Sequence, residues 1–201
     1  MTTLDHSVPA THVAGSTPYA WPWNADLTPT GTAAVIVQPT EHWPAPWLGQ
    51  QGAATRAAVV EVVEAVRAAG GSVIRVLTSP PIRASEPSAQ GGFGVTADAT
   101  IAAVGIDGFF GSALDAHLRA NDIQRLVLVG AGLETSVHST MRSANDRGYE
   151  CLLVVDACLA YDDAVTPASV SMIEMSGGIF GAVGTSAAVV EALATVIGEK
   201  R

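Results

Sequence analysis

The fold is decided by the stretch of residues 126–157, Leu126-Val-Leu-Val-Gly-Ala-Gly-Leu-Glu-Thr-Ser136-Val-His-Ser-Thr-Met-Arg-Ser-Ala-Asn-Asp-Arg-Gly-Tyr-Glu-Cys-Leu-Leu-Val-Val-Asp-Ala157. It begins with a fully apolar strand at 126–129 and passes through a glycine-containing turn into a helix at 136–147, which Gly148 ends. A second apolar strand follows at 151–156. This order predicts a βαβ unit, in which both strands run parallel in one sheet.

The same alternation extends outward from this stretch. The predicted strands cover residues 33–37, 72–77, 100–104, 126–129, 151–156 and 179–183, and the predicted helices 54–69, 112–121, 136–147, 167–175 and 186–197. They predict an α/β fold: a three-layer αβα sandwich with a six-stranded, mostly parallel, doubly wound sheet. Residues 1–30 lack this periodicity and are expected to form an N-terminal arm, and residues 31–201 a single domain.

Composition excludes several classes of function. The chain has 201 residues with 48% hydrophobic content and a formal net charge of -9, and its nine arginines are scattered. Nucleic-acid binding requires clustered positive charge, so we expect no nucleic-acid partner. The sequence shows neither a secretory leader nor a run of about 18 apolar residues, which predicts a cytoplasmic protein without a membrane span.

Metal and disulfide chemistry are also not expected. Five dispersed histidines show no ligand spacing, so we predict no metal site and no cofactor. Cys151 and Cys158 lie an odd number of residues apart on or beside one predicted strand, which should place their side chains on opposite faces. We therefore expect two buried free thiols in a reducing compartment.

The turn before the helix at 136–147 is the favoured place for chemistry, because ligands of such sheets bind outside the carboxyl ends of the strands. Ser136 lies in the first turn of this helix, near free backbone N–H groups and the positive end of the helix dipole. Two interpretations of Ser136 are open. Thr135 and Ser136 can cap the helix, as serine and threonine commonly do, or Ser136 can act as a nucleophile.

The stretch at 126–157 resembles the strand, nucleophile turn and helix of the isochorismatase-like cysteine hydrolases, in which a cysteine stands at the position of Ser136. The resemblance extends over about residues 19–194. Pro18-Tyr-Ala-Trp-Pro-Trp23 with Asp26-Leu-Thr-Pro29, and Met172-Ile-Glu-Met-Ser-Gly-Gly-Ile-Phe-Gly-Ala-Val183, are closest to the branch that acts on small ureides such as biuret and ureidoacrylate. The resemblance to this family implies the isochorismatase-like hydrolase fold, assembly into dimers or tetramers, and a site with an aspartate base, a lysine and the cysteine nucleophile.

All three residues of that triad are replaced here. The aspartate position falls at Gln38, whose amide cannot take a proton from a nucleophile. The lysine position falls at Ala103, and the only lysine of the chain is Lys200. Ser136, in place of the cysteine, carries a hydroxyl that is far less ionised than a thiol near neutral pH. The family mechanism is therefore not possible with these residues.

The remaining candidate residues are predicted from their places around the crevice. Gly132, Leu133, Thr135 and Phe109 are expected to contact a substrate or ligand. His42, supported by Glu41, could serve as a replacement base for Ser136, although a histidine in such a loop is more often an exposed loop residue. His138 faces about 200° away from Ser136 on the helix and is expected at the surface or in an interface.

Three functions remain open from the sequence. The favoured one is a non-catalytic subunit, in a homo- or hetero-oligomer, that stabilises or regulates an active, cysteine-bearing homologue. The alternative is a divergent hydrolase acting on the C–N bond of a small amide or ureide, with a site rebuilt around Ser136 and His42. The third is a module that binds a small molecule without turning it over.

Overall fold

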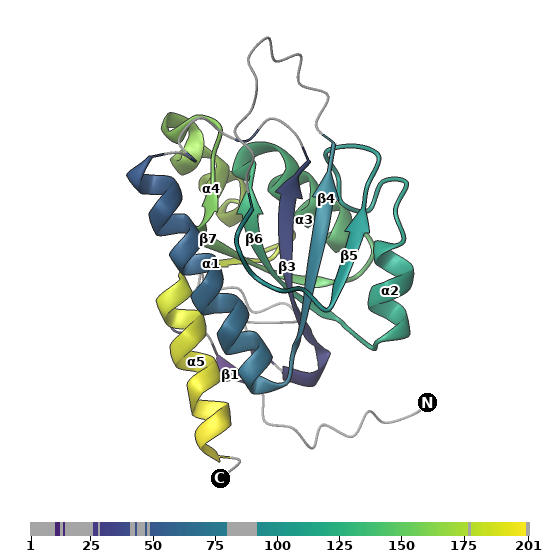
Figure 1. Ribbon diagram of the computed structural model, residues 1–201, viewed down its shortest axis with the longest axis vertical. Coiled ribbons are helices and arrows are strands. Elements are labelled where there is room, and N and C mark those ends of the chain that lie inside the picture. Colours follow the sequence, from purple (N-terminus) through teal and green to yellow (C-terminus); the bar gives the residue numbers. More distant parts are fainter. Residues whose placement is uncertain are drawn as a thin grey trace.

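The computed structural model describes residues 11–12, 14, 26–27, 29–40, 43, 47, 49–79, 92–176 and 178–199. Its centre is a six-stranded sheet with the strand order β5-β4-β3-β6-β7-β8 (Figure 1). Every neighbouring pair is parallel. The strands are β3 (Thr32–Pro39), β4 (Ser72–Thr78), β5 (Ala99–Ala102), β6 (Arg125–Ala131), β7 (Glu150–Leu159) and β8 (Ala182–Gly184).

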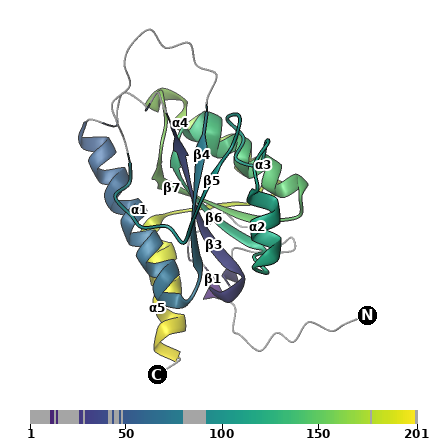
Figure 2. The same ribbon diagram turned by 45° about the vertical axis from the view of Figure 1, so that its right-hand side comes forward.

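Five helices cover the two faces of the sheet, which confirms the predicted three-layer α/β fold. Figure 2 shows α1 and α5 together on one side of the sheet and α2 and α3 on the other. The buried side chains of α4 belong to the same core cluster as those of α2 and α3. The bounds are α1 (Gln50–Ala69), α2 (Leu114–Ala120), α3 (His138–Asp146), α4 (Thr166–Glu174) and α5 (Ser186–Glu199).

Each face of the sheet has its own hydrophobic core, built from alternate residues of the strands. In β3, Ala34 and Ile36 pack toward α1 and α5, whereas Val35 and Val37 belong to the cluster of α2, α3 and α4. All the apolar residues from 33 to 37 are fully buried, as expected for a central strand of a parallel sheet covered on both faces. This central strand carries Gln38 to the edge where the strands end.

Strand β7 contains the one departure from regular pairing that affects a prediction. Its register with β6 changes from Leu128↔Leu153 to Gly130↔Cys158, so β7 has additional residues between these two pairs. This bulge shifts the side-chain alternation, and Cys151 and Cys158 lie in the same core cluster. The expectation that they point to opposite faces is wrong, but both are buried free thiols.

The element boundaries differ from the predicted ones in a few places. Helix α1 begins at Gln50, not at residue 54, and α3 is preceded by a one-turn π-helix, η3 (Leu133–Val137). Two short 3-10 helices, η1 (Pro29–Gly31) and η4 (Asp163–Val165), precede β3 and α4. In the predicted arm, β1 (Thr11–His12) pairs antiparallel with β2 (Asp26–Leu27); most of the other arm residues lie outside the described ranges. None of the helices in the described ranges is both long enough and apolar enough to cross a membrane.

Candidate functional site

The candidate site lies where the strand order reverses. From β3 the chain proceeds to β4 and β5 on one side of the sheet, and then returns to β6, β7 and β8 on the other. The carboxyl ends of β3 and β6 therefore diverge into different connections, which leaves room for a ligand between them. Gln38 near the end of β3, Thr78 at the end of β4 and Ser136 after β6 are placed at this edge.

Two glycines shape the turn that leads to Ser136. Gly130 has φ +137°, and a Cβ there would lie 2.0 Å from the carbonyl oxygen of Val37 in β3. Gly132 has φ +84°, and its carbonyl oxygen accepts hydrogen bonds from the N–H groups of Thr135 (3.0 Å) and Val137 (2.9 Å). The close approach of the strands and the left-handed backbone both favour residues without a Cβ. They fix how the chain enters η3.

Ser136 is held in the interior. Its side chain is 0% exposed, and its hydroxyl oxygen accepts a hydrogen bond of 3.3 Å from Thr78 Oγ1. Its carbonyl oxygen accepts one of 2.7 Å from Thr140 Oγ1. Neither η3 nor α3 has a side-chain cap, so the interpretation of Ser136 as a helix cap is wrong. The sequence does not predict that Thr78 contacts Ser136, and the signal that it does give for Thr78 is a position directly after a predicted strand.

The two other triad positions hold neither a base nor a cation. Gln38 is half-buried, and its side-chain oxygen is fully buried without a hydrogen-bond partner in the part of the chain that the structure describes. Ala103 is buried just after β5, where its N–H donates to the Leu77 carbonyl at 2.8 Å. In the sheet, Gln38 of β3 pairs with Leu77 of β4, and Leu77 pairs with Ala102 of β5. Ala103 therefore lies two strands away from Gln38 and one residue closer to the carboxyl end.

Glu134 has a structural role beside this turn. Its Oε1 accepts hydrogen bonds from the N–H groups of Tyr161 (2.8 Å) and Asp162 (3.1 Å), which joins η3 to the segment after β7. Burial, with a smaller effect of the Glu134 charge, raises the pKa of Tyr161 to about 12. The phenol is therefore neutral at physiological pH and is not a ready base for Ser136.

Of the four predicted ligand-binding residues, two form the turn before Ser136 and two lie in the hydrophobic core. Gly132 and Thr135 form the turn, where Thr135 Oγ1 donates to the Gly132 carbonyl at 3.4 Å, and Leu133 is buried in the core. Phe109 is only 5% exposed, and its ring stacks on Tyr149 at 5.8 Å between centroids. Phe109 is thus a core residue, whereas its neighbour Phe110 is exposed.

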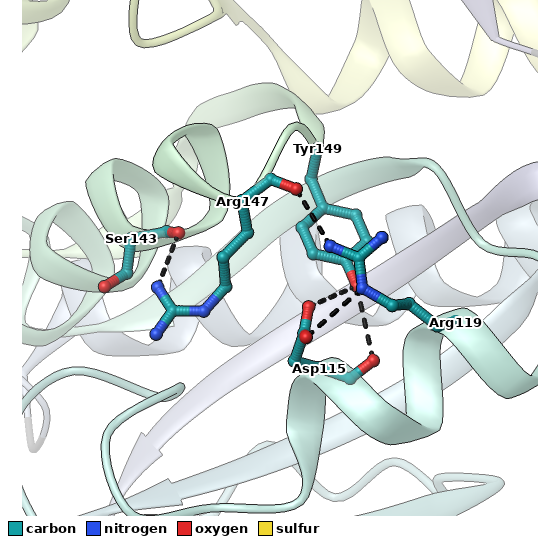
Figure 3. Close-up of polar contacts among 5 residues, drawn as sticks. All are labelled: Asp115, Arg119, Ser143, Arg147 and Tyr149. Atoms are coloured by element: carbon teal, nitrogen blue, oxygen red, sulfur yellow. Dashed lines mark hydrogen bonds and ion pairs between the residues drawn. The ribbon is translucent and has the colours of Figure 1, made fainter.

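Tyr149, the partner of Phe109, belongs to a polar cluster that joins α2 to the end of α3 (Figure 3). Its hydroxyl donates to Asp115 Oδ1 at 2.7 Å, and this hydrogen bond lowers the pKa of the Asp115 carboxyl. Arg119 donates to the same carboxylate and to the Arg147 carbonyl, and Arg147 donates to the Ser143 carbonyl. These contacts join α2 to the end of α3, and none of them includes Ser136.

The predictions for His138 and His42 differ in how far the structure tests them. His138 is only 7% exposed, so its expected place at the surface is wrong. Its Nε2 accepts a hydrogen bond from Arg142 Nε at 3.3 Å, and burial, followed by the Arg142 charge, lowers its pKa. His42 and Glu41 lie outside the described residues, so their predicted pairing with Ser136 stays a prediction. Among the residues that are described, no three His, Cys, Asp or Glu side chains are grouped so as to hold a metal ion.

Comparison with known proteins agrees with this architecture. The sequence model of the isochorismatase domain family matches residues 32–188 of this chain. A cysteine hydrolase from Pseudomonas syringae pv. phaseolicola 1448A superposes with a TM-score of 0.68 at 20% identity, over 94% of this chain and 99% of that one. An isochorismatase family protein from Burkholderia thailandensis gives 0.66 at 25% identity, over 84% and 97%. The N-carbamoylsarcosine amidase of Thermoplasma acidophilum gives 0.57 at 22% identity, over 77% and 96%.

Proposed function

Because the chain belongs to the isochorismatase family, we propose that it is a non-catalytic member that assembles with an active, cysteine-bearing homologue and stabilises or regulates it. Solved relatives include a cysteine hydrolase and an N-carbamoylsarcosine amidase. The motifs at residues 18–29 and 172–183 resemble the branch that acts on ureides, so we propose that the partner hydrolyses a small ureide or amide. A cytoplasmic location is part of this proposal.

The observation that carries the proposal is the environment of Ser136. Within the part of the chain that the structure describes, the hydrogen-bond partner of its hydroxyl is Thr78, whose own hydroxyl cannot act as a base near neutral pH. Gln38 carries an amide, and Ala103 a methyl group. A serine without a base is a poor nucleophile, and general acid–base catalysis typically contributes about 10²–10⁴-fold to a rate. The fold is thus retained, while the groups that would activate a nucleophile are replaced.

Assembly is supported by exposed apolar side chains on α4 and the segment that follows it. Met172, Met175 and Ile179 are all exposed, although large apolar residues of a monomer are usually buried. Grouped exposed apolar residues often mark a protein interface. They are consistent with an oligomer and do not choose between an identical and a homologous partner.

The test is native mass spectrometry of the protein purified, at its natural expression level, from cells that produce it. We expect a complex of fixed stoichiometry with a homologue that has aspartate, lysine and cysteine at the positions of Gln38, Ala103 and Ser136. Hydrolysis of ureides should then be assayed on that complex, with and without this chain. A homo-oligomer as the sole species would overturn the proposal.

A divergent hydrolase is the alternative, and the retained hydroxyl of Ser136 at the carboxyl edge of the sheet favours it. In that case the purified chain alone should hydrolyse a small amide or ureide, and both Ser136→Ala and His42→Ala should abolish the turnover. Turnover that survives either substitution excludes a Ser136–His42 pair as the catalytic machinery.

A further inference from the structure

The exposed sulfur-containing side chains of the described residues lie together on α4 and at its end. Met175 is 77% exposed and Met172 is 41% exposed, whereas Met141 is 0% exposed. The two cysteines are buried as well, Cys151 at 0% and Cys158 at 7% exposure. Within the described ranges, a reagent that attacks sulfur therefore meets Met175 and Met172 first.

Helix α4 is apolar on two sides. Ile173 points into the core and is 1% exposed. On the outer side, Ala168, Met172 and Met175 are exposed at a spacing of four and three residues, which places them in one row. Helical hydrogen bonding reaches the end of this row, because Met175 N–H donates to the Ser171 carbonyl at 2.8 Å. A helix that is apolar on both sides is usually covered on both, so the outer row of α4 suits contact with a partner.

Oxidation of these methionines changes the polarity of the outer row. When a thioether reacts with hydrogen peroxide, the S–O bond forms as the O–O bond breaks. The sulfur loses two electrons, and the second peroxide oxygen leaves with both hydrogens as water. The product is the polar methionine sulfoxide. Burial of its oxygen against a partner without a hydrogen bond should weaken association by about tenfold or more.

We propose that Met175, together with Met172, is a site of oxidation by hydrogen peroxide, and that sulfoxide formation there prevents the chain from assembling through the outer row of α4. This inference rests on the proposed function, because it takes that row to be the assembly surface. The reduced thioethers permit assembly, and the sulfoxides keep the subunit apart.

The order of oxidation is tested on the isolated full chain, which requires no partner. The chain is treated with hydrogen peroxide, and the sulfoxides are located by peptide-mapping mass spectrometry. We expect Met175 to react before Met172, and both to react at least about tenfold faster than Met141, which should become reactive when urea is added. Oxidation of Met141 as fast as Met175 in the folded chain would overturn the proposal.

The effect on assembly is tested with variants produced at the natural expression level and purified for native mass spectrometry. Met175→Gln places a polar group of similar length in the outer row and should lower the assembled fraction by about tenfold. The double variant Met172→Leu/Met175→Leu keeps the row apolar, so it should assemble like the wild type and stay assembled after a peroxide treatment that separates the wild type. Val104→Gln, at an apolar residue that is 67% exposed but lies outside α4, is the matched control and should assemble normally. Thermal unfolding verifies that every variant is folded.

The outcomes separate this proposal from the proposed function. Assembly that persists after Met175 is fully converted to the sulfoxide, or normal assembly of Met175→Gln, would overturn the oxidation switch. The untreated protein reveals the partner: a homo-oligomer that separates on oxidation supports the switch and contradicts the proposed function, whereas a complex with a homologue that withstands oxidation does the reverse. A monomer in the untreated sample would overturn both.

Discussion

Replacing Gln38 with methionine should stabilise the protein. The side-chain oxygen of Gln38 is buried without a partner among the described residues, and an unsatisfied buried polar group costs about 1–3 kcal/mol. Methionine has a similar length and adapts to irregular space, so Gln38→Met removes this penalty with little change in packing. We expect the free energy of unfolding to rise by about 1–2 kcal/mol, which corresponds to roughly 2–8 °C in Tm for a chain of this size.

Urea denaturation followed by far-UV circular dichroism measures this change, and the slope with urea should stay constant. Gln124→Met, at an exposed glutamine, is the matched control and should change stability by less than about 0.5 kcal/mol. A loss of more than about 1 kcal/mol in Gln38→Met would refute the reasoning, because it would mean that the amide makes favourable hydrogen bonds. Such a result would indicate a polar pocket that still serves a ligand.

Gln38→Glu extends this test to pH. Burial should raise the pKa of the introduced carboxyl above its ordinary value of about 4.3. Such a group is protonated in both states below that value, so this variant should match the wild type most closely near pH 4. It should become progressively less stable than the wild type as the pH rises through the raised pKa toward 7. A stability difference that is constant from pH 4 to 7 would contradict the buried position of the side-chain oxygen at this residue.

Three further predictions concern other buried groups. Ser136→Ala should lower the free energy of unfolding by about 0.5–1.5 kcal/mol, because the Thr78 hydroxyl loses its partner, whereas no loss in urea denaturation would contradict the hydrogen bond. Because the pKa of His138 is lowered in the folded protein, the unfolded chain takes up this proton at a higher pH than the folded chain. The free energy of unfolding should therefore fall as the pH drops below about 6.5. His138→Gln should flatten this dependence in urea titrations between pH 7.5 and 5. Burial raises the pKa of both cysteines, so neither should react with a thiol reagent at pH 7.5 until denaturant is added.

The layers of the fold could be predicted because the sheet is buried on both faces. Short apolar runs such as residues 126–129 are typical of strands that are buried on both faces. The glycines at 70 and 148 end the helices before β4 and β7. The sequence predicts a start of α1 four residues later than the structure shows. Gln50, Gln51 and Gly52 show neither a capping residue nor an apolar period, and Gly49 makes no side-chain cap.

Predictions that depended on exact side-chain direction were less successful. The direction of Cys158 relative to Cys151 depends on the bulge in β7, which side-chain alternation in the sequence does not reveal. The angle between His138 and Ser136 on the helix predicts an outside position for His138, but the helix is packed on more than one side there. The π-helical turn around Ser136 results from the glycine-shaped exit of β6, and it replaces the expected cap.

The chemical identity of the site followed from residue types alone. An amide at 38, a methyl group at 103 and a hydroxyl at 136 are properties of the sequence that no fold can alter. The sequence did not indicate which neighbour Ser136 would contact, since Thr78 comes from a strand on the far side of β3. The parallel sheet brings these two residues together.

Ammonia release from biuret, N-carbamoylsarcosine and nicotinamide by the purified chain is the decisive comparison, measured side by side for wild type and Ser136→Ala. If the site has lost its chemistry, the two proteins release ammonia at the same background rate with every substrate. Turnover by the wild type that disappears in folded Ser136→Ala would contradict a non-catalytic role and establish Ser136 as a working nucleophile.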